Sequence, residues 1–193
     1  AVIEMARASG LAMVPPRRRN PRVTTTLGTG QILKEAAEKG FNRVIVGLGG
    51  SATNDAGAGM ATALGARFLD SRGNALPPGG AALVSLDRLD TSGLLPRLTD
   101  MEIIAATDVT NPLCGPTGAS AIFGPQKGAS KGVVAELDAA LLHFAQVVKR
   151  DTGSDVLDIP GGGAAGGLGA GLIAFAGAKI QSGIDMVCEV LDF

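Results

Sequence analysis

The feature that most constrains the fold is a short apolar run that ends in a glycine-rich loop. The run Arg43–Gly47 has the pattern of a buried strand, and it leads directly into the loop Gly49-Gly-Ser-Ala-Thr-Asn-Asp55. A helix of small residues is expected next, from Ala56 to Leu64. A strand, a glycine loop and a helix in this order form the repeating unit of α/β proteins, which bind ligands at the carboxyl ends of their strands. The chain is therefore expected to be an α/β protein with its chemistry in such loops.

The residues of this first loop suit the binding of an anion. Glycines let a ligand approach the backbone, and the N–H groups at a helix start favour negative charge. Hydroxyl and amide side chains add donors, and the aspartate could hold Mg²⁺ or accept a proton. A tight turn, in which Asn54 or Asp55 only caps the next helix, explains the same residues. The candidates are Gly49, Gly50, Ser51, Thr53, Asn54 and Asp55.

A second unit of this kind lies further along the chain. Met101–Ala105 is expected to be another buried strand, followed by the polar loop Thr107–Gly115. An aspartate directly after a buried strand suits a metal ligand or a general base, so Asp108 is a candidate. Asn111 precedes Pro112 and is held extended, which could aim its amide at a ligand. An Asx turn that merely closes the strand remains an equal alternative.

The spacing of apolar residues predicts two longer helices. One begins at Thr29, its cap, and ends at Gly40, and the other spans Ser130–Arg150 with Ser130 as its cap. Residues 67–76 are expected to form a hairpin. No linker divides the 193 residues, so they fit one α/β domain with a mixed sheet and flanking helices.

Three further features have to be weighed. Lys127 lies between glycines before the long helix, where an ammonium suits phosphate, although a lone lysine is more commonly exposed. Residues 161–166 match the pattern GxGxxG, but no strand precedes them, so close packing is favoured over a phosphate-facing helix start. A P-loop kinase is excluded because the Walker A pattern is absent. His143, the single histidine, is expected to be structural or solvated and not functional.

Charge and cysteine content argue against several classes. The formal net charge of −1 offers no basic surface for nucleic acid or an acidic membrane. No apolar run is long enough to span a membrane, and no signal peptide is visible. Cys114 and Cys188 lie far apart and match no metal spacing, which indicates reduced thiols and a cytoplasmic location.

Taken together, the loops resemble the signature blocks of the bacterial-type glycerate kinase family. The order and spacing of the blocks are those of the family, and the resemblance covers essentially the whole chain. It implies ATP-dependent phosphorylation of D-glycerate, usually to 2-phosphoglycerate, with ATP and Mg²⁺ as cofactors. The matching blocks are Thr24–Gly30, Gly47–Met60, Thr107–Ala119, Phe123–Ala129 and Gly163–Ala170.

The resemblance also implies two α/β domains, one inserted into the other, and this chain resembles the inserted one. Family blocks expected before and after it are missing, and both ends interrupt apolar runs. Residues 1–193 are thus expected to be a single domain cut at both ends from a larger two-domain kinase. The flanking domain is then a partner, and a homo-oligomer remains open. The alternative is a ligand-binding or assembly module without activity. A dinucleotide-dependent oxidoreductase is a weaker alternative.

Phosphoryl transfer depends mostly on positioning and charge neutralisation, and this sets the roles expected within the family. Asp108 is the preferred base or Mg²⁺ ligand, with Asp55 second, and Lys127 would neutralise phosphate charge. Which loop meets ATP and which meets the acid is left open. The expected donors to substrate or phosphate are Ser51, Thr53 and Asn54.

Overall fold

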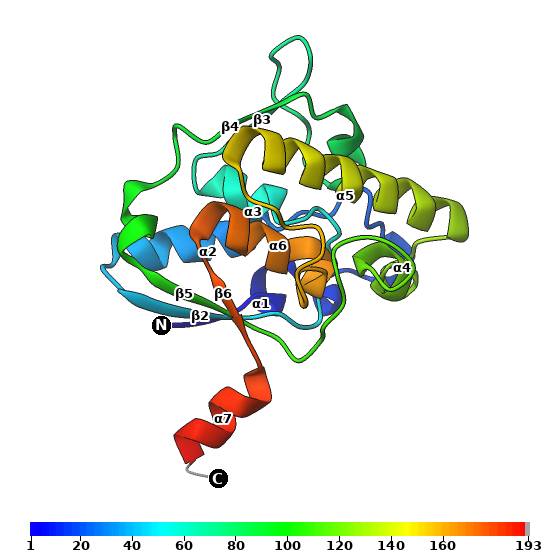
Figure 1. Ribbon diagram of the computed structural model, residues 1–193. Helices are drawn as coiled ribbons and strands as arrows, with labels where there is room; N and C mark the ends of the chain where they lie inside the picture. The colour runs from blue at the N-terminus through cyan, green and yellow to red at the C-terminus, as the bar shows by residue number, and fades with distance from the viewer. Residues whose placement is uncertain (192–193) are drawn as a thin grey trace.

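The computed structural model describes residues 1–191 and contains two separate sheets. In the larger sheet all pairings are parallel and the strand order is β1-β2-β5-β6 (Figure 1). In the smaller sheet β3 and β4 pair antiparallel. The α/β class is confirmed, with parallel and antiparallel pairings in different sheets. The strands are β1 Val2–Glu4, β2 Arg43–Gly47, β3 Arg67–Leu69, β4 Arg88–Asp90, β5 Glu102–Ala106 and β6 Lys179–Gln181.

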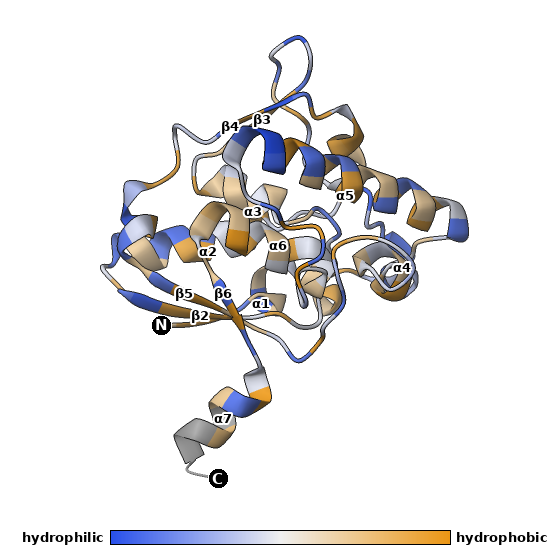
Figure 2. Ribbon diagram, viewed as in Figure 1, coloured by the Kyte–Doolittle hydropathy of each residue, from blue (hydrophilic) through white to orange (hydrophobic). Residues whose placement is uncertain are grey.

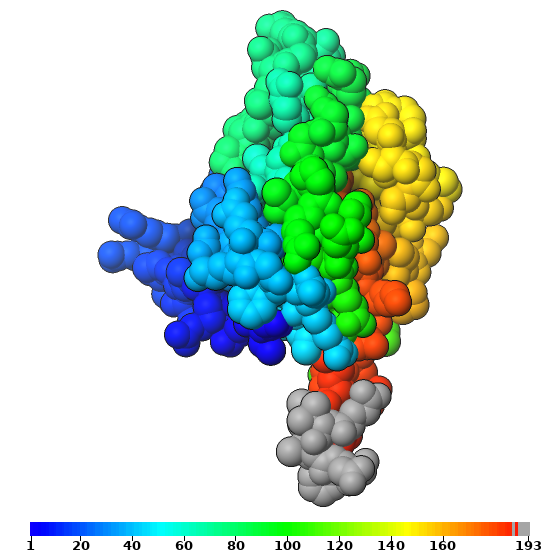
Figure 3. Space-filling model, turned by 90° about the vertical axis from the view of Figure 1, so that its left-hand side faces the viewer, coloured from blue at the N-terminus to red at the C-terminus, as the bar shows by residue number. Residues whose placement is uncertain are grey.

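The helices lie on one side of the larger sheet in the view of Figure 1. The exception is α7, which extends away from the body of the domain in Figure 1. In the view of Figure 3 the red segment that leads into α7 lies at the lower end of the molecule. No helix within residues 1–191 is both long and apolar enough to cross a membrane. The helices are α1 Ala6–Ser9, α2 Leu27–Glu38, α3 Ala58–Ala63, α4 Ala119–Phe123, α5 Lys131–Thr152, α6 Ala164–Ala176 and α7 Gly183–Leu191.

The core lies between the sheet and the helices, where Figure 2 shows mostly apolar ribbon. Alternate residues of β2, Val44 and Val46, are fully buried against the helices. Because the chain has no Trp or Tyr, phenylalanine supplies its aromatic packing. Phe68, Phe144 and Phe175 pack together with ring centroids 5.7–6.2 Å apart, which joins β3, α5 and α6.

Two of the four expected helix boundaries are confirmed, and α5 ends at Thr152, two residues beyond the expected Arg150. Gly40 has φ +81° and follows the end of α2, and Ser130 caps α5 by accepting the amide of Val133. The assignment of Thr29 as a cap is wrong. Thr29 is the third residue of α2, where its hydroxyl is buried and 2.9 Å from the hydroxyl of Ser9.

The expected hairpin at residues 67–76 is only partly formed. The amide of Asp70 donates to the carbonyl of Asn74 at 2.9 Å, so the turn itself is present. A single bridge, Leu69 to Ala75, follows it, because β3 takes its ladder partners from β4.

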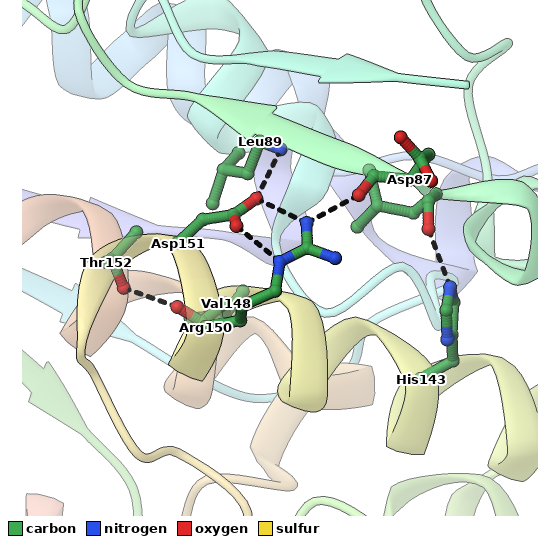
Figure 4. Close-up of polar contacts among 8 residues, drawn as sticks. Asp87, Leu89, His143, Val148, Arg150, Asp151 and Thr152 are labelled. Carbon is green, nitrogen blue, oxygen red and sulfur yellow. Dashed lines mark hydrogen bonds and ion pairs between the residues drawn. The ribbon is translucent and has the colours of Figure 1, made fainter. Parts of the chain in front are cut away.

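His143 has the structural role expected from its place in the helix. Its Nε2 donates to the carbonyl of Leu86, 2.6 Å away, and so holds α5 against the segment before β4 (Figure 4). Two turns on, the guanidinium of Arg150 donates to the carboxylate of Asp151 and to the carbonyl of Asp87. These contacts lie at the α5–β4 junction and not among the candidate loops.

Candidate functional site

The two loops indicated by the sequence meet at one edge of the larger sheet. Strands β2 and β5 are adjacent and parallel, and Gly47 pairs with Ala106 at their carboxyl ends. The loops that follow, 48–55 and 107–115, therefore begin side by side. Two pockets open at this edge, and they share the residues Leu48, Gly49 and Gly50.

The smaller of these pockets, here called the loop pocket, has a volume of about 170 Å³. Its lining comes from four segments: the glycine loop, the loop after β5, the segment before α5 and the start of α6. All of its lining residues except Lys127 are uncharged. They are Leu48, Gly49, Gly50, Ser51, Val109, Phe123, Gln126, Lys127 and Ala165.

The larger pocket, here called the open pocket, has a volume of about 400 Å³ and carries negative charge. Glu4 at the end of β1 and Asp108 beyond β5 both line it, together with Thr107. The peptide Gly49–Gly50 belongs to the walls of both pockets. A group with positive charge therefore lies on one side of this peptide, and carboxylates lie on the other.

Lys127 is buried, in contrast to the expectation for a lone lysine. Only 1% of its surface is exposed, and its Nζ donates to the carbonyl of Thr53 at 2.6 Å. Burial lowers the pKa of Lys127 to about 7, while the negative charge of Asp55 opposes this shift. Lys127 thus bonds to the backbone of the glycine loop at Thr53. It also lines the loop pocket.

This burial predicts a pH dependence of folding. Between the lowered pKa of about 7 and the ordinary value of 10.5, the unfolded chain binds a proton that the folded chain does not. Stability should therefore rise with pH across this window, and fall as pH drops towards 7. Urea unfolding at a series of pH values should show the rise in the wild type and not in Lys127→Met. An equal rise in both proteins would exclude Lys127 as its source.

Asp55 is fully buried, and its carboxylate is occupied by the chain itself. It accepts the amide and hydroxyl of Thr26 at 2.8 and 3.0 Å, and the amides of Gly59 and Gly57 at 3.2 and 3.3 Å. Burial raises the pKa of Asp55, and these hydrogen bonds partly oppose the shift. It lines neither pocket at the sheet edge. This geometry fits a clamp between the glycine loop and the start of α2, and a role as base stays a prediction.

Asp108 has the opposite environment, because its carboxylate is exposed in the open pocket. Its Oδ1 accepts the amide of Ile184 at 3.1 Å and the hydroxyl of Ser182 at 3.0 Å. These bonds lower the pKa of Asp108, so the carboxylate is charged at neutral pH. The contact with the start of α7 was not anticipated, although Ser182 before Gly183 is a signal for a helix start.

The remaining predicted polar residues line neither pocket. Asn111 donates from Nδ2 to the carbonyl of Thr117 at 2.7 Å, which closes its own loop. Asn54 donates to the hydroxyl of Ser120 at 2.9 Å. Within the described residues, Thr53 Oγ1 and Asn54 Oδ1 are buried without a partner. Of the predicted binding residues, Gly49, Gly50 and Ser51 line the loop pocket. Thr53, Asn54 and Asn111 do not.

The glycine run before and within α6 serves close packing, as favoured from the sequence. A Cβ on Gly166 would lie 2.0 Å from the carbonyl oxygen of Thr53, so no side chain fits there. Ala165 itself has φ +53° and lines the loop pocket. Sequence reasoning missed Ala165 as a pocket residue; the glycine pair that follows it was the available signal for an unusual turn.

The carboxylates that line the open pocket at this edge are those of Glu4 and Asp108. Within residues 1–191, no group of three or more His, Cys, Asp or Glu side chains could hold a metal ion. Mg²⁺ commonly binds through one or two carboxylates, with waters and substrate phosphates as the other ligands. An exposed, charged Asp108 in an open pocket fits that mode. Cys114 does not contribute, because burial raises the pKa of its thiol to about 12.

Comparison with known proteins shows the family of this chain. The sequence model of the Glycerate kinase family matches residues 1–193. The chain is 55% identical to Glycerate 2-kinase of Escherichia coli K12 and 51% identical to Glycerate kinase of Bacillus subtilis 168, in each case over 100% of this chain and 50% of the relative. A crystal structure of a proposed glycerate kinase 2 from Salmonella typhimurium LT2 superposes with a TM-score of 0.96 and 52% identity, covering 99% of this chain and 51% of that one.

The chain thus spans about half the length of the curated relatives it matches. The match includes the strand-end loops, the buried lysine and the glycine run that together form the two pockets, because it extends over every residue. On the strength of the family match and of these relatives, the chain belongs to the glycerate kinase family.

Proposed function

We propose that this chain forms one wall of the active site of an ATP-dependent kinase that phosphorylates D-glycerate to 2-phosphoglycerate. The observation that carries the proposal is the pair of pockets on either side of Gly49–Gly50. One contains a buried lysine and the other an exposed aspartate, which are the two charges that phosphoryl transfer to a hydroxy acid needs. The similarity to a protein named Glycerate 2-kinase supports the choice of product.

In the proposed reaction, a hydroxyl oxygen of glycerate attacks the γ-phosphorus of ATP. The new O–P bond forms as the bond between the γ-phosphorus and the bridging oxygen breaks, and ADP leaves with that oxygen. The hydroxyl proton passes to the carboxylate of Asp108, which is charged at neutral pH. In the alternative in which Asp108 is a Mg²⁺ ligand and not the base, Mg²⁺ held by Asp108 and phosphate oxygens would supply charge neutralisation. Lys127 and the amides of the glycine loop hold anionic groups in place.

We further propose that the active enzyme contains a second domain of the same polypeptide. The relatives are about twice as long as this chain, which supports this arrangement. So does the sheet itself, because parallel sheets are usually covered on both faces. Here the helices lie on one side in Figure 1, and Val2 on β1 is 77% exposed.

The test is a coupled assay of ADP release by the complete polypeptide with Mg-ATP and D-glycerate. We expect turnover with D-glycerate, and phosphorus NMR should identify the product as 2-phosphoglycerate. Resonances of 3-phosphoglycerate would correct the position of transfer. Binding of D-glycerate without any ADP release would instead favour the alternative of a ligand-binding module.

A further inference from the structure

The loop pocket offers backbone donors that the described part of the chain does not use. The amides of Gly49, Gly50 and Ser51 donate to no acceptor in residues 1–191. The amide of Ala165, across the pocket, donates to none of these residues either. A Cβ at Gly49 would meet nothing within 4 Å, so the space in front of this residue is free. Backbone N–H groups around a concave surface are a recurring arrangement for binding anions.

The charge in the loop pocket also favours an anion. Lys127 is the ionisable residue of its lining, and a bound anion would favour its protonated form. Its Nζ makes one hydrogen bond, to Thr53, although an ammonium group can donate three. No carboxylate belongs to the lining. The open pocket is different, since Glu4 and Asp108 line it and favour an anion that arrives with a cation, such as a Mg²⁺-bound phosphate, over a free carboxylate.

Size separates the two anions that the proposed reaction involves. Pockets for drug-sized ligands have volumes of about 300–1,000 Å³. The loop pocket, at about 170 Å³, has room for a small acid of a few heavy atoms but not for a nucleotide. The open pocket, at about 400 Å³, is more than twice as large and continuous with solvent at the sheet edge.

We propose that the loop pocket is the subsite for the carboxylate of the acid substrate, between Lys127 and the amides of residues 49–51, and that the phosphoryl donor occupies the open pocket. This assignment rests on the proposed function and decides which loop meets which substrate. The Gly49–Gly50 peptide then separates acceptor from donor. The acceptor hydroxyl faces Asp108 over this peptide, where a side chain at Gly49 would block the path.

Gln126 provides a test that does not disturb the core, because its side chain is exposed and lines the loop pocket. Gln126→Glu adds one negative charge at nearly constant shape. We expect the affinity for D-glycerate, measured by calorimetric titration, to fall about tenfold, because the added charge repels a carboxylate bound in the same pocket. The affinity for Mg-ATP should fall less, because Gln126 does not line the open pocket and the Gly49–Gly50 peptide lies between the two pockets.

The matched control is Gln31→Glu, which makes the same charge change at an exposed position of α2 outside both pockets. It should leave both affinities unchanged. Unaltered binding of D-glycerate by Gln126→Glu, or a loss of Mg-ATP affinity in its place, would overturn the subsite assignment. Failure of the proposed function is a separate result, because then the wild-type kinase itself would release no ADP with D-glycerate.

Discussion

Replacing Asp108 with Asn is expected to lower the kcat for glycerate phosphorylation by about a thousandfold while the protein stays folded. The amide cannot accept the proton of the acceptor hydroxyl, and it removes the negative charge from the open pocket. Folding should be preserved, because an Asn oxygen can still accept the bonds from Ser182 and Ile184, and Asn caps helices about as well as Asp. Steady-state kinetics of the complete kinase, with circular dichroism as a check of folding, measures both effects.

The control for this change is Asp185→Asn, which removes an exposed carboxylate in the first turn of α7. Asp185 does not line the open pocket. Its kcat should stay within about twofold of the wild type, as expected for a surface change. An Asp108→Asn enzyme with near-normal turnover would remove Asp108 from the mechanism and leave the base to be found on another segment.

Replacing Asp55 with Ala should lower the free energy of unfolding by about 3–5 kcal/mol. The substitution leaves the amides of Gly57 and Gly59 and both donors of Thr26 without their buried acceptor. It also removes the negative charge that favours the protonated form of buried Lys127. The effect is therefore larger than that of deleting one surface hydrogen bond, which changes stability by about 0.5–1.5 kcal/mol.

Urea denaturation measures this difference, with Asp100→Ala, an exposed aspartate, as the control expected to stay within about 0.5 kcal/mol of the wild type. Asp55→Asn should fall between the two, since the amide oxygen restores an acceptor but not the charge. If Asp55→Ala were as stable as the control and inactive, Asp55 would be a catalytic group and not a clamp.

Local sequence patterns predicted the elements that position the site. The apolar run Arg43–Gly47 became β2 with the expected bounds, and the second strand, β5, begins one residue later than expected. Both are short buried strands, and a run of apolar residues adjacent in the sequence is enough to predict such a strand. The prediction that their loops carry the site followed from strand order in α/β proteins, and the shared edge of β2 and β5 places the loops together.

The errors concern contacts between residues distant in sequence. Thr29 resembled a cap, but the residue before α2 is Thr26. The hydroxyl of Thr26 donates to Asp55 and accepts the amide of Met60, and both partners are distant in sequence. A lone lysine is more commonly exposed, but Lys127 is buried, and its Nζ bonds to the carbonyl of Thr53, 74 residues away. The family resemblance indicated roles for both Asp55 and Asp108. It could not show that Asp55 holds the loop while Asp108 faces the pocket, since burial decides that difference.

The most direct test of the account is a crystal structure of the complete kinase with D-glycerate and a non-hydrolysable ATP analogue. The account predicts the glycerate carboxylate in the loop pocket, within hydrogen-bonding distance of Lys127 and the amides of residues 49–51. The γ-phosphate should lie in the open pocket beside Asp108. Glycerate bound elsewhere, for instance in the 270 Å³ apolar pocket near Phe68 and Pro77, would contradict it.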